Sequence, residues 1–124
     1  IVNIASTEGL GATKFGSPYT AAKTGVIGLT RSLAVELGGE GITVNCICPG
    51  WTETAIIQPQ VEARAAAHGG DRDAGIGSLL SEKQPSLRTS DPSEIGAVAA
   101  FLCQPSMHNL TGTAIPVDGG WSAQ

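Results

Sequence analysis

Three side chains near the beginning of the chain have the types and the spacing that proton transfer requires. Tyr19 and Lys23 are four residues apart, so in a helix they lie on one face and can reach a common ligand. A tyrosine with a pKa of about 10 is a poor base at neutral pH, but a neighbouring ammonium group stabilises a phenolate and lowers its pKa. Ser6 adds a hydroxyl to hold the oxygen atom that gains or loses the proton. The three residues are therefore candidates for general acid–base catalysis.

A strand and a helix must position these side chains. Residues 1–5 are rich in β-branched side chains, which indicates a buried parallel strand directly before the serine. Site residues of α/β sheets lie at this carboxyl end of the strands. After a glycine-containing loop over residues 9–16, Ser17 as N-cap and Pro18 predict a helix start, and Gly38 ends a helix of about twenty residues.

The predicted helix has two different sides. Its core side is predicted from the apolar spacing of Val26, Leu29, Leu33 and Leu37. Its opposite side has small residues that let another helix approach closely, namely Ala21, Ala22, Gly25 and Gly28.

The rest of the chain continues the alternation of strands and helices. Residues 42–48 are typical of a second buried strand, which Pro-Gly ends, and residues 113–117 of a third strand. Between these strands, residues 52–67 have a loosely helical pattern, residues 68–74 form a polar surface stretch, and a capping box at Asp91 predicts a helix that runs to about Cys103. The order predicts an α/β fold, namely the C-terminal half of a doubly wound, Rossmann-like parallel sheet with three strands and flanking helices.

Composition limits the partners and the extent of the domain. The 124 residues carry 7 Lys+Arg against 11 Asp+Glu, a net charge of −4, so we expect neither a nucleic-acid nor a membrane partner. Only 15% of the residues are charged, against about 25% in ordinary globular chains. The chain also starts within a predicted strand, without an initiator Met, a signal peptide or a transmembrane run. We therefore expect residues 1–124 to be the C-terminal fragment of one larger, cytoplasmic domain.

The cysteines and histidines do not indicate a metal site. Cys46 and Cys48 lie at i and i+2 of a predicted strand, where we expect them to be buried as small apolar residues. His68 and His108 have no second ligand at a metal-binding spacing. We expect no metal and no disulfide framework.

The candidate residues stand in a wider pattern. Tyr-x3-Lys alone is a weak signal, but here it opens a long helix, follows a strand-end Ser and precedes a strand that ends in Pro-Gly. This combination resembles the short-chain dehydrogenase/reductase family, and the resemblance extends over the whole chain. It implies an oxidoreductase in which Tyr19 is the general acid or base, Ser6 orients the substrate oxygen, and Lys23 also binds the nicotinamide ribose.

The resemblance also implies a cofactor. We expect NAD, with NADP left open, because the segment of the family that chooses between them and its glycine-rich phosphate loop would lie upstream of residue 1. Besides Tyr19 and Lys23, the expected cofactor contacts are Pro49, Gly50, Trp51, Thr52 and Thr54.

Further strings, at residues 47–51, 82–87 and 117–124, resemble family members that act on a small hydroxy acid, 3-hydroxybutyrate. This resemblance implies that Gln60 helps to hold the substrate carboxylate. It also places Trp51 and Trp121, with Ser6, beside the small-molecule substrate.

Two positions depart from that pattern. Where those members have a His and a Lys that donate to the substrate carboxylate, this chain has Glu8 and Gly16. A carboxylate at Glu8 would repel an anionic substrate if it pointed into the site. Lys14 is a candidate for the missing cation.

Three functions therefore stay open at this level. The first is a dehydrogenase of 3-hydroxybutyrate, the second is the same reaction on a neutral alcohol or ketone, and the third is a truncated, non-catalytic assembly module. The family commonly pairs its long helix across a two-fold axis, so we expect a homo-oligomer, a tetramer or a dimer.

Overall fold

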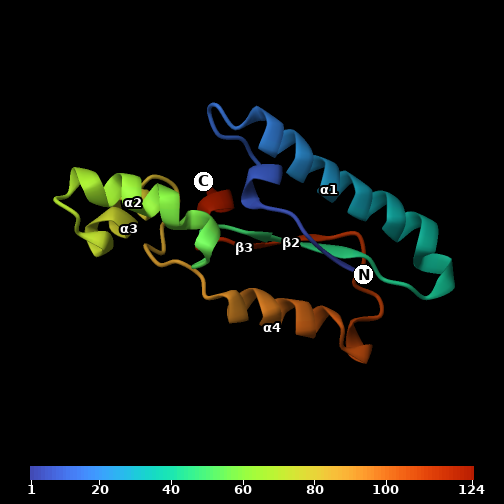
Figure 1. Ribbon diagram of the computed structural model, residues 1–124. Coiled ribbons are helices and arrows are strands. Elements are labelled where there is room, and N and C mark those ends of the chain that lie inside the picture. The colour runs from blue at the N-terminus through green and yellow to red at the C-terminus, as the bar shows by residue number, and fades with distance from the viewer.

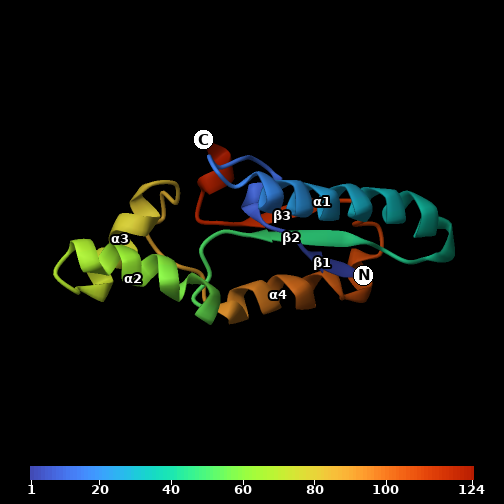
Figure 2. The same cartoon turned by 45° about the horizontal axis from the view of Figure 1, so that its top comes forward.

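Two helical layers enclose a three-stranded parallel sheet in the computed structural model, which describes all residues, 1–124 (Figure 1). The strands β1 (Val2–Ile4), β2 (Asn45–Pro49) and β3 (Ala114–Val117) lie in the order β1-β2-β3. Helix α1 (Ser17–Leu37) covers one face of the sheet and α4 (Pro92–Leu102) the other (Figure 2). The predicted α/β fold with three parallel strands and flanking helices is confirmed.

The register of β1 against β2 brings the two strand ends together. Ile4 pairs with Ile47, and one residue later the backbone N–H of Ala5 donates to the Ile47 carbonyl at 2.8 Å. Because the strands are parallel, the segments that follow them leave the sheet at the same edge. The residues after β1 and after β2 are thus neighbours, although more than forty positions separate them in the sequence.

Helix α1 begins and packs differently from the prediction. Its N-cap is Gly16, with no side-chain cap, and Ser17 is already helical, so the predicted Ser17 cap is wrong. Its buried residues are Ile27, Thr30 and Ala34, whereas Leu29 is 53% exposed. The sheet under α1 has only three strands, so the helix covers it with one narrow stripe, and this stripe lies one residue away from the predicted apolar spacing.

Two short helices project from the carboxyl end of the sheet (Figure 2). A 3-10 turn (Ala55–Ile57) leads into α2 (Gln58–Ala67), as the helical pattern predicted. Helix α3 (Arg72–Ser81) was not predicted, and it starts inside the stretch expected to be only polar surface. Asp71 explains the start, because its side chain accepts hydrogen bonds from the backbone N–H groups of Asp73 and Ala74.

The predicted capping box is present at the start of α4. The Asp91 side chain accepts from the backbone N–H of Ser93, and the Glu94 side chain accepts from the backbone N–H of Asp91. The helix then runs to Leu102, within one residue of the predicted end.

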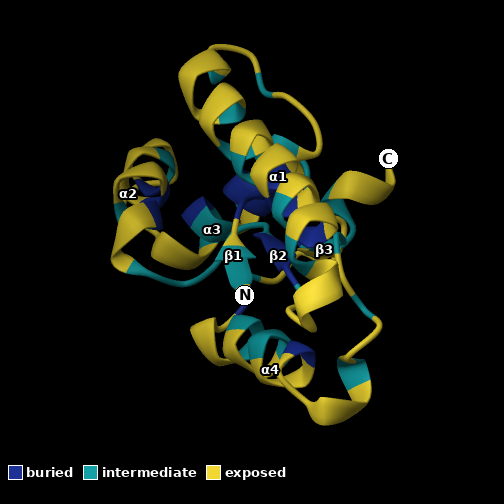
Figure 3. Ribbon diagram, turned by 90° about the vertical axis from the view of Figure 1, so that its right-hand side faces the viewer, coloured by how far each residue is buried: buried dark blue, intermediate teal, exposed yellow.

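The centre of the core is β2 (Figure 3). Cys46, Ile47 and Cys48 have no exposed surface, and Cys46 and Cys48 pack with Ala5 and Ile27, which confirms the predicted burial of both cysteines. Burial and the neighbouring Cys46 raise the pKa of Cys48 to about 12. The Cys48 thiol is therefore protonated and inert at neutral pH.

The structure also describes the histidines, possible metal ligands and the apolar character of the helices. Both His68 and His108 are exposed. No three His, Cys, Asp or Glu side chains come together in a geometry that would hold a metal ion. None of the helices has both the length and the apolar character needed to cross a membrane.

Gly75 should matter for the packing of α3 on α2. A Cβ at this position would lie 2.8 Å from the backbone nitrogen of Ala65 and 2.9 Å from the carbonyl of Val61, so Gly75→Ala should destabilise the fold by about 1–3 kcal/mol. Gly77 lies on the same helix with open space around it, and Gly77→Ala should stabilise it by about 0.5–1 kcal/mol. Thermal unfolding of both variants checks the prediction, and equal melting temperatures would contradict it.

Candidate active site

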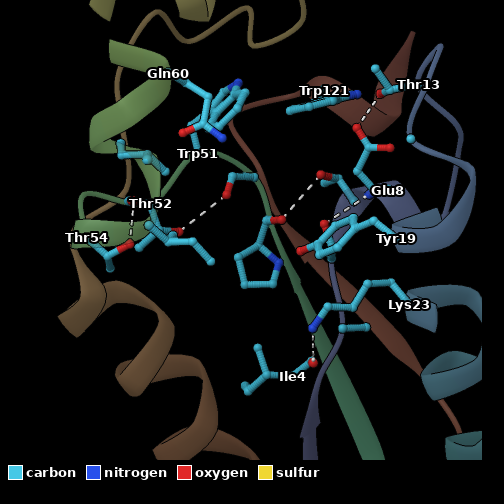
Figure 4. A pocket seen from close by; sticks show the side chains of 18 of the residues that line it. Ile4, Glu8, Thr13, Tyr19, Lys23, Trp51, Thr52, Thr54, Gln60 and Trp121 are labelled. Carbon is cyan, nitrogen blue, oxygen red and sulfur yellow. Dashed lines mark hydrogen bonds between the residues drawn. The ribbon is translucent and has the colours of Figure 1, made fainter. Parts of the chain in front are cut away.

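A cavity of about 590 Å³ lies at the carboxyl ends of β1 and β2 (Figure 4). Its walls come from the turn after β1, the start of α1, the loop after β2, the start of α2 and the C-terminal turn. All ten residues singled out from the sequence line it: Ser6, Tyr19, Lys23, Pro49, Gly50, Trp51, Thr52, Thr54, Gln60 and Trp121. The fold therefore brings the whole predicted set into one hollow.

Ser6 is held at the end of β1 by its role as a helix cap. Its Oγ accepts a hydrogen bond from the backbone N–H of Glu8 at 3.1 Å, and it caps the 3-10 turn Thr7–Gly9. Beside it, the Thr7 hydroxyl donates to the Pro49 carbonyl at 3.3 Å and ties this turn to the end of β2. Because the Ser6 oxygen is the acceptor in its hydrogen bond, the hydroxyl hydrogen stays available to a ligand.

Tyr19 and Lys23 share one face at the start of α1. Tyr19 is 49% exposed and lines the cavity, and the Lys23 Nζ lies 5.6 Å from the centroid of its ring. The Lys23 ammonium donates to the Ile4 carbonyl at 3.2 Å, which pins it beside β1 (Figure 4). An ammonium group has three hydrogens, so two remain for a ligand.

A close approach of backbones sets the distance between Ser6 and α1. A Cβ at Gly9 would lie 2.8 Å from the Lys23 carbonyl and 2.9 Å from the Ile27 Cδ1. The turn after Ser6 therefore packs on α1 only because Gly9 has no side chain. The Thr24 hydroxyl fastens the same contact by donating to the Gly9 carbonyl at 3.3 Å.

The loop after β2 depends on Gln84, whose role sequence reasoning missed. Gln84 is 1% exposed, its Oε1 accepts from the backbone N–H of Trp51 at 3.1 Å, and its Nε2 donates to the Arg88 carbonyl. A Cβ at Gly50 would come within 2.8 Å of the same Oε1. Residues 82–87 carry part of the family resemblance, but no local sequence pattern links Gln84 to residues 50–51, because the contact spans 33 positions.

The outer part of the same loop is tied to α3. The Arg72 guanidinium lies 2.5 Å from the carboxylate of Glu53. In the sequence Glu53 stands between Thr52 and Thr54, which both line the cavity. Its hydrogen bond holds the pKa of Glu53 below its ordinary value, with a smaller contribution from Gln58. Helix α3, absent from the sequence prediction, thus helps to place Thr52 and Thr54.

Two tryptophans form the far wall of the cavity. The rings of Trp51 and Trp121 are 6.1 Å apart between centroids and tilted by 36°. The buried Asp118 positions Trp121, because its carboxylate accepts from the backbone N–H groups of Gly120 at 3.0 Å and Ser122 at 2.9 Å.

The two positions that depart from the expected pattern also face the cavity. Glu8 and Gly16 both line it, and Glu8 points toward Thr13 and the Trp121 side, away from Lys23 (Figure 4). The Thr13 hydroxyl donates to Glu8 Oε1, and the Thr20 hydroxyl donates to Oε2 at 3.3 Å. Lys14 lines the cavity too, with its Nζ 5.0 Å from the ring centroid of the exposed Phe15.

Known proteins are similar to the chain over its full length. A family model described as Enoyl-(Acyl carrier protein) reductase matches residues 1–122. The D-beta-hydroxybutyrate dehydrogenase of Cupriavidus necator is 44% identical over 124 residues, which are 100% of this chain and 48% of that protein. The chain thus spans about half the length of the curated relatives it matches.

Solved structures share the fold. A short chain dehydrogenase family protein from Francisella tularensis superimposes with a TM-score of 0.90 at 31% identity, covering 100% of this chain and 51% of that one. The L-sorbose reductase of Gluconobacter frateurii, complexed with NADPH and L-sorbose, gives a TM-score of 0.91 at 27% identity, with 100% and 47% covered.

Removing the Gln84 amide should loosen the loop after β2. Gln84→Leu removes the partner of the Trp51 backbone N–H, which should cost about 1–3 kcal/mol of stability, whereas the exposed Arg88 carbonyl keeps the Ser86 hydroxyl at 3.4 Å. Gln104→Leu, at an exposed position, is the matched control for thermal unfolding. A Gln84→Leu melting temperature equal to that of the control would contradict this role.

Proposed function

Because the chain belongs to the short-chain dehydrogenase/reductase family, we propose that the whole protein transfers a hydride between NAD and a small hydroxy acid, 3-hydroxybutyrate, or its ketone, acetoacetate. The observation that carries the proposal is the convergence of Ser6, Tyr19 and Lys23 on one cavity at the carboxyl edge of the sheet. The relative named D-beta-hydroxybutyrate dehydrogenase supports the choice of substrate.

The chain's own residues supply the proton chemistry. The Tyr19 hydroxyl gives a proton to the substrate oxygen during ketone reduction and takes it back during alcohol oxidation. Ser6 donates its free hydroxyl hydrogen to the same oxygen and holds it beside Tyr19. Lys23, anchored on the Ile4 carbonyl, keeps its ammonium 5.6 Å from the centroid of the Tyr19 ring, next to the proposed acid.

The residues around the cavity suit a nicotinamide cofactor, which supplies or accepts the hydride when bound. The two spare hydrogens of the Lys23 ammonium suit ribose hydroxyls. Gly50 leaves the end of β2 without a side chain, and the hydroxyls of Thr52 and Thr54 line the hollow beside it. NAD is the form we propose, and a competition between NAD and NADP in the whole protein tests it.

Two tryptophans and one amide line the part of the cavity that we propose for the substrate. Trp51 and Trp121 enclose the carbon skeleton. The amide nitrogen of Gln60, at the start of α2, donates to the Ile56 and Ile57 carbonyls at 3.1 Å, and it would exchange these partners for the substrate carboxylate.

Lys14 is the cation that we propose for the same carboxylate. The Lys14 ammonium contacts the Phe15 ring, and the loop that carries Lys14 includes the exposed Gly11. Lys14 can therefore turn toward a bound carboxylate.

Glu8 favours a second candidate substrate. Its carboxylate lies in the cavity wall, and an uncharged alcohol or ketone meets no repulsion there. The solved relative complexed with L-sorbose, a neutral sugar, is named a reductase of that compound.

The exposed side of α1 supports a proposed homo-oligomer, a dimer or a tetramer. A Cβ at Gly25 or Gly28 would meet nothing within 4 Å, so a second helix could pack closely there. Light scattering of the whole protein over a dilution series tests this, and a monomer at all concentrations would contradict it.

Tyr19→Phe in the whole protein should lower kcat about a hundredfold or more, because it removes the proton donor and keeps the ring. The control is Phe101→Leu, because Phe101 is an exposed aromatic residue on α4 that does not line the cavity. The assay follows NADH absorbance with acetoacetate. A Tyr19→Phe enzyme as fast as the wild type would overturn the proposed acid.

Lys14→Ala should raise KM for 3-hydroxybutyrate several-fold, because it removes the proposed cation for the carboxylate, and it should leave KM for a neutral ketone unchanged. A substrate panel on the wild-type protein is the companion measurement. An unchanged KM for 3-hydroxybutyrate would rule out Lys14, and a preference for uncharged carbonyls over acetoacetate would favour the second candidate.

A further inference from the structure

Lys83 lies outside the cavity and contacts one of the residues in its wall, Thr13. It follows α3 and does not line the cavity, but its Nζ donates to the Thr13 hydroxyl, 70 positions away, at 2.5 Å. The same ammonium lies 5.0 Å from the ring centroid of Trp121, and the Gln124 side chain donates to the Lys83 carbonyl at 2.9 Å. Lys83 therefore joins the loop before α1 to the C-terminal turn.

The Thr13 hydroxyl links two opposite charges. It accepts from the Lys83 ammonium and donates its own hydrogen to Glu8 Oε1. The Thr20 hydroxyl donates to the other oxygen, so both oxygens of the Glu8 carboxylate have partners on the wall side of the cavity. Lys83 and Glu8 are thus connected through the one hydroxyl of Thr13.

The connection from Lys83 through Thr13 to Glu8 adds a positive charge beside the only carboxylate in the cavity wall. The charged side chains that line the cavity are Glu8, Lys14 and Lys23. Lys23 is fastened to the Ile4 carbonyl, and Lys14 rests over the exposed Phe15 ring, so neither of them partners Glu8. Lys83 is the cation that compensates it.

We propose that Lys83 is a positioning residue for the substrate. Through Thr13 it holds the Glu8 carboxylate against the cavity wall and compensates its charge, so that the pocket accepts a substrate that carries a carboxylate. The inference rests on the proposed function and explains how a hydroxy acid is admitted although Glu8 stands where a cationic donor was expected.

The test compares two substrates of one skeleton in the whole protein, 3-hydroxybutyrate and its uncharged methyl ester. Lys83→Met should raise KM for 3-hydroxybutyrate about fivefold, with kcat little changed, because the Glu8 charge is then uncompensated. KM for the ester should not change. Lys83→Arg should restore the wild-type value, and Arg31→Met, which removes a positive charge from the exposed side of α1, is the control.

A double variant separates charge compensation from a merely structural role. In Glu8→Gln/Lys83→Met no carboxylate is left to compensate, so KM for 3-hydroxybutyrate should return to within about twofold of the Glu8→Gln value. Equal losses for both substrates in Lys83→Met, or no relief by Glu8→Gln, would overturn the inference.

A readout without turnover keeps this test distinct from that of the proposed function. In the wild-type protein, absence of activity with both substrates would overturn the proposed substrate. Independently, Lys83→Met should speed hydrogen exchange at the backbone amides of residues 10–16, because Thr13 loses its tether, whereas Arg31→Met should not. Unchanged exchange in Lys83→Met would overturn the positioning role of Lys83.

Discussion

The parallel pairing of β1 with β2 is the constraint on which the candidate site depends. It directs the segments after Ile4 and after Pro49 to the same edge of the sheet, and the bond from Ala5 to Ile47 continues the ladder to the residue before Ser6. Helix α1 then has to return across this edge, which brings its first turns to Ser6. The strand pairing, together with this return of α1, thus assembles side chains from distant parts of the sequence.

Close backbone contacts and buried polar groups refine this arrangement. Gly9 lets the turn after Ser6 touch α1, and Gly50 lets the end of β2 approach Gln84. Gln84 and Asp118 are buried, and each gives its hydrogen-bonding atoms to the backbone of a loop that carries a tryptophan. A buried polar group is costly without partners, so these contacts specify one loop conformation rather than several.

Much of the fold and the site was predictable because local patterns encode it. The β-branched run before Ser6, the capping box at Asp91 and the Tyr19–Lys23 spacing all depend on neighbours in the sequence. The predicted burial of the first strand is wrong, however, because Ile4 is 49% exposed at the edge of the sheet. The buried stripe of α1, helix α3 and the roles of Gln84 and Lys83 were missed. Helix α3 does have a local signal, the Asp71 cap, which lies inside a stretch that is polar and contains glycine. The buried stripe of α1 and the roles of Gln84 and Lys83 depend on what the chain packs against, and the contacts of Gln84 with Trp51 and of Lys83 with Thr13 span 33 and 70 positions.

The most direct test of the account is whether the whole protein moves a hydride at this site. The measurement follows deuterium from NADH that carries deuterium at both hydrogen positions of nicotinamide C4 into the product of acetoacetate reduction, by mass spectrometry. The account predicts one deuterium on the carbon that bears the new hydroxyl, in a single stereochemical configuration. Product without deuterium, or no product from enzyme that has bound both NADH and acetoacetate, would contradict it.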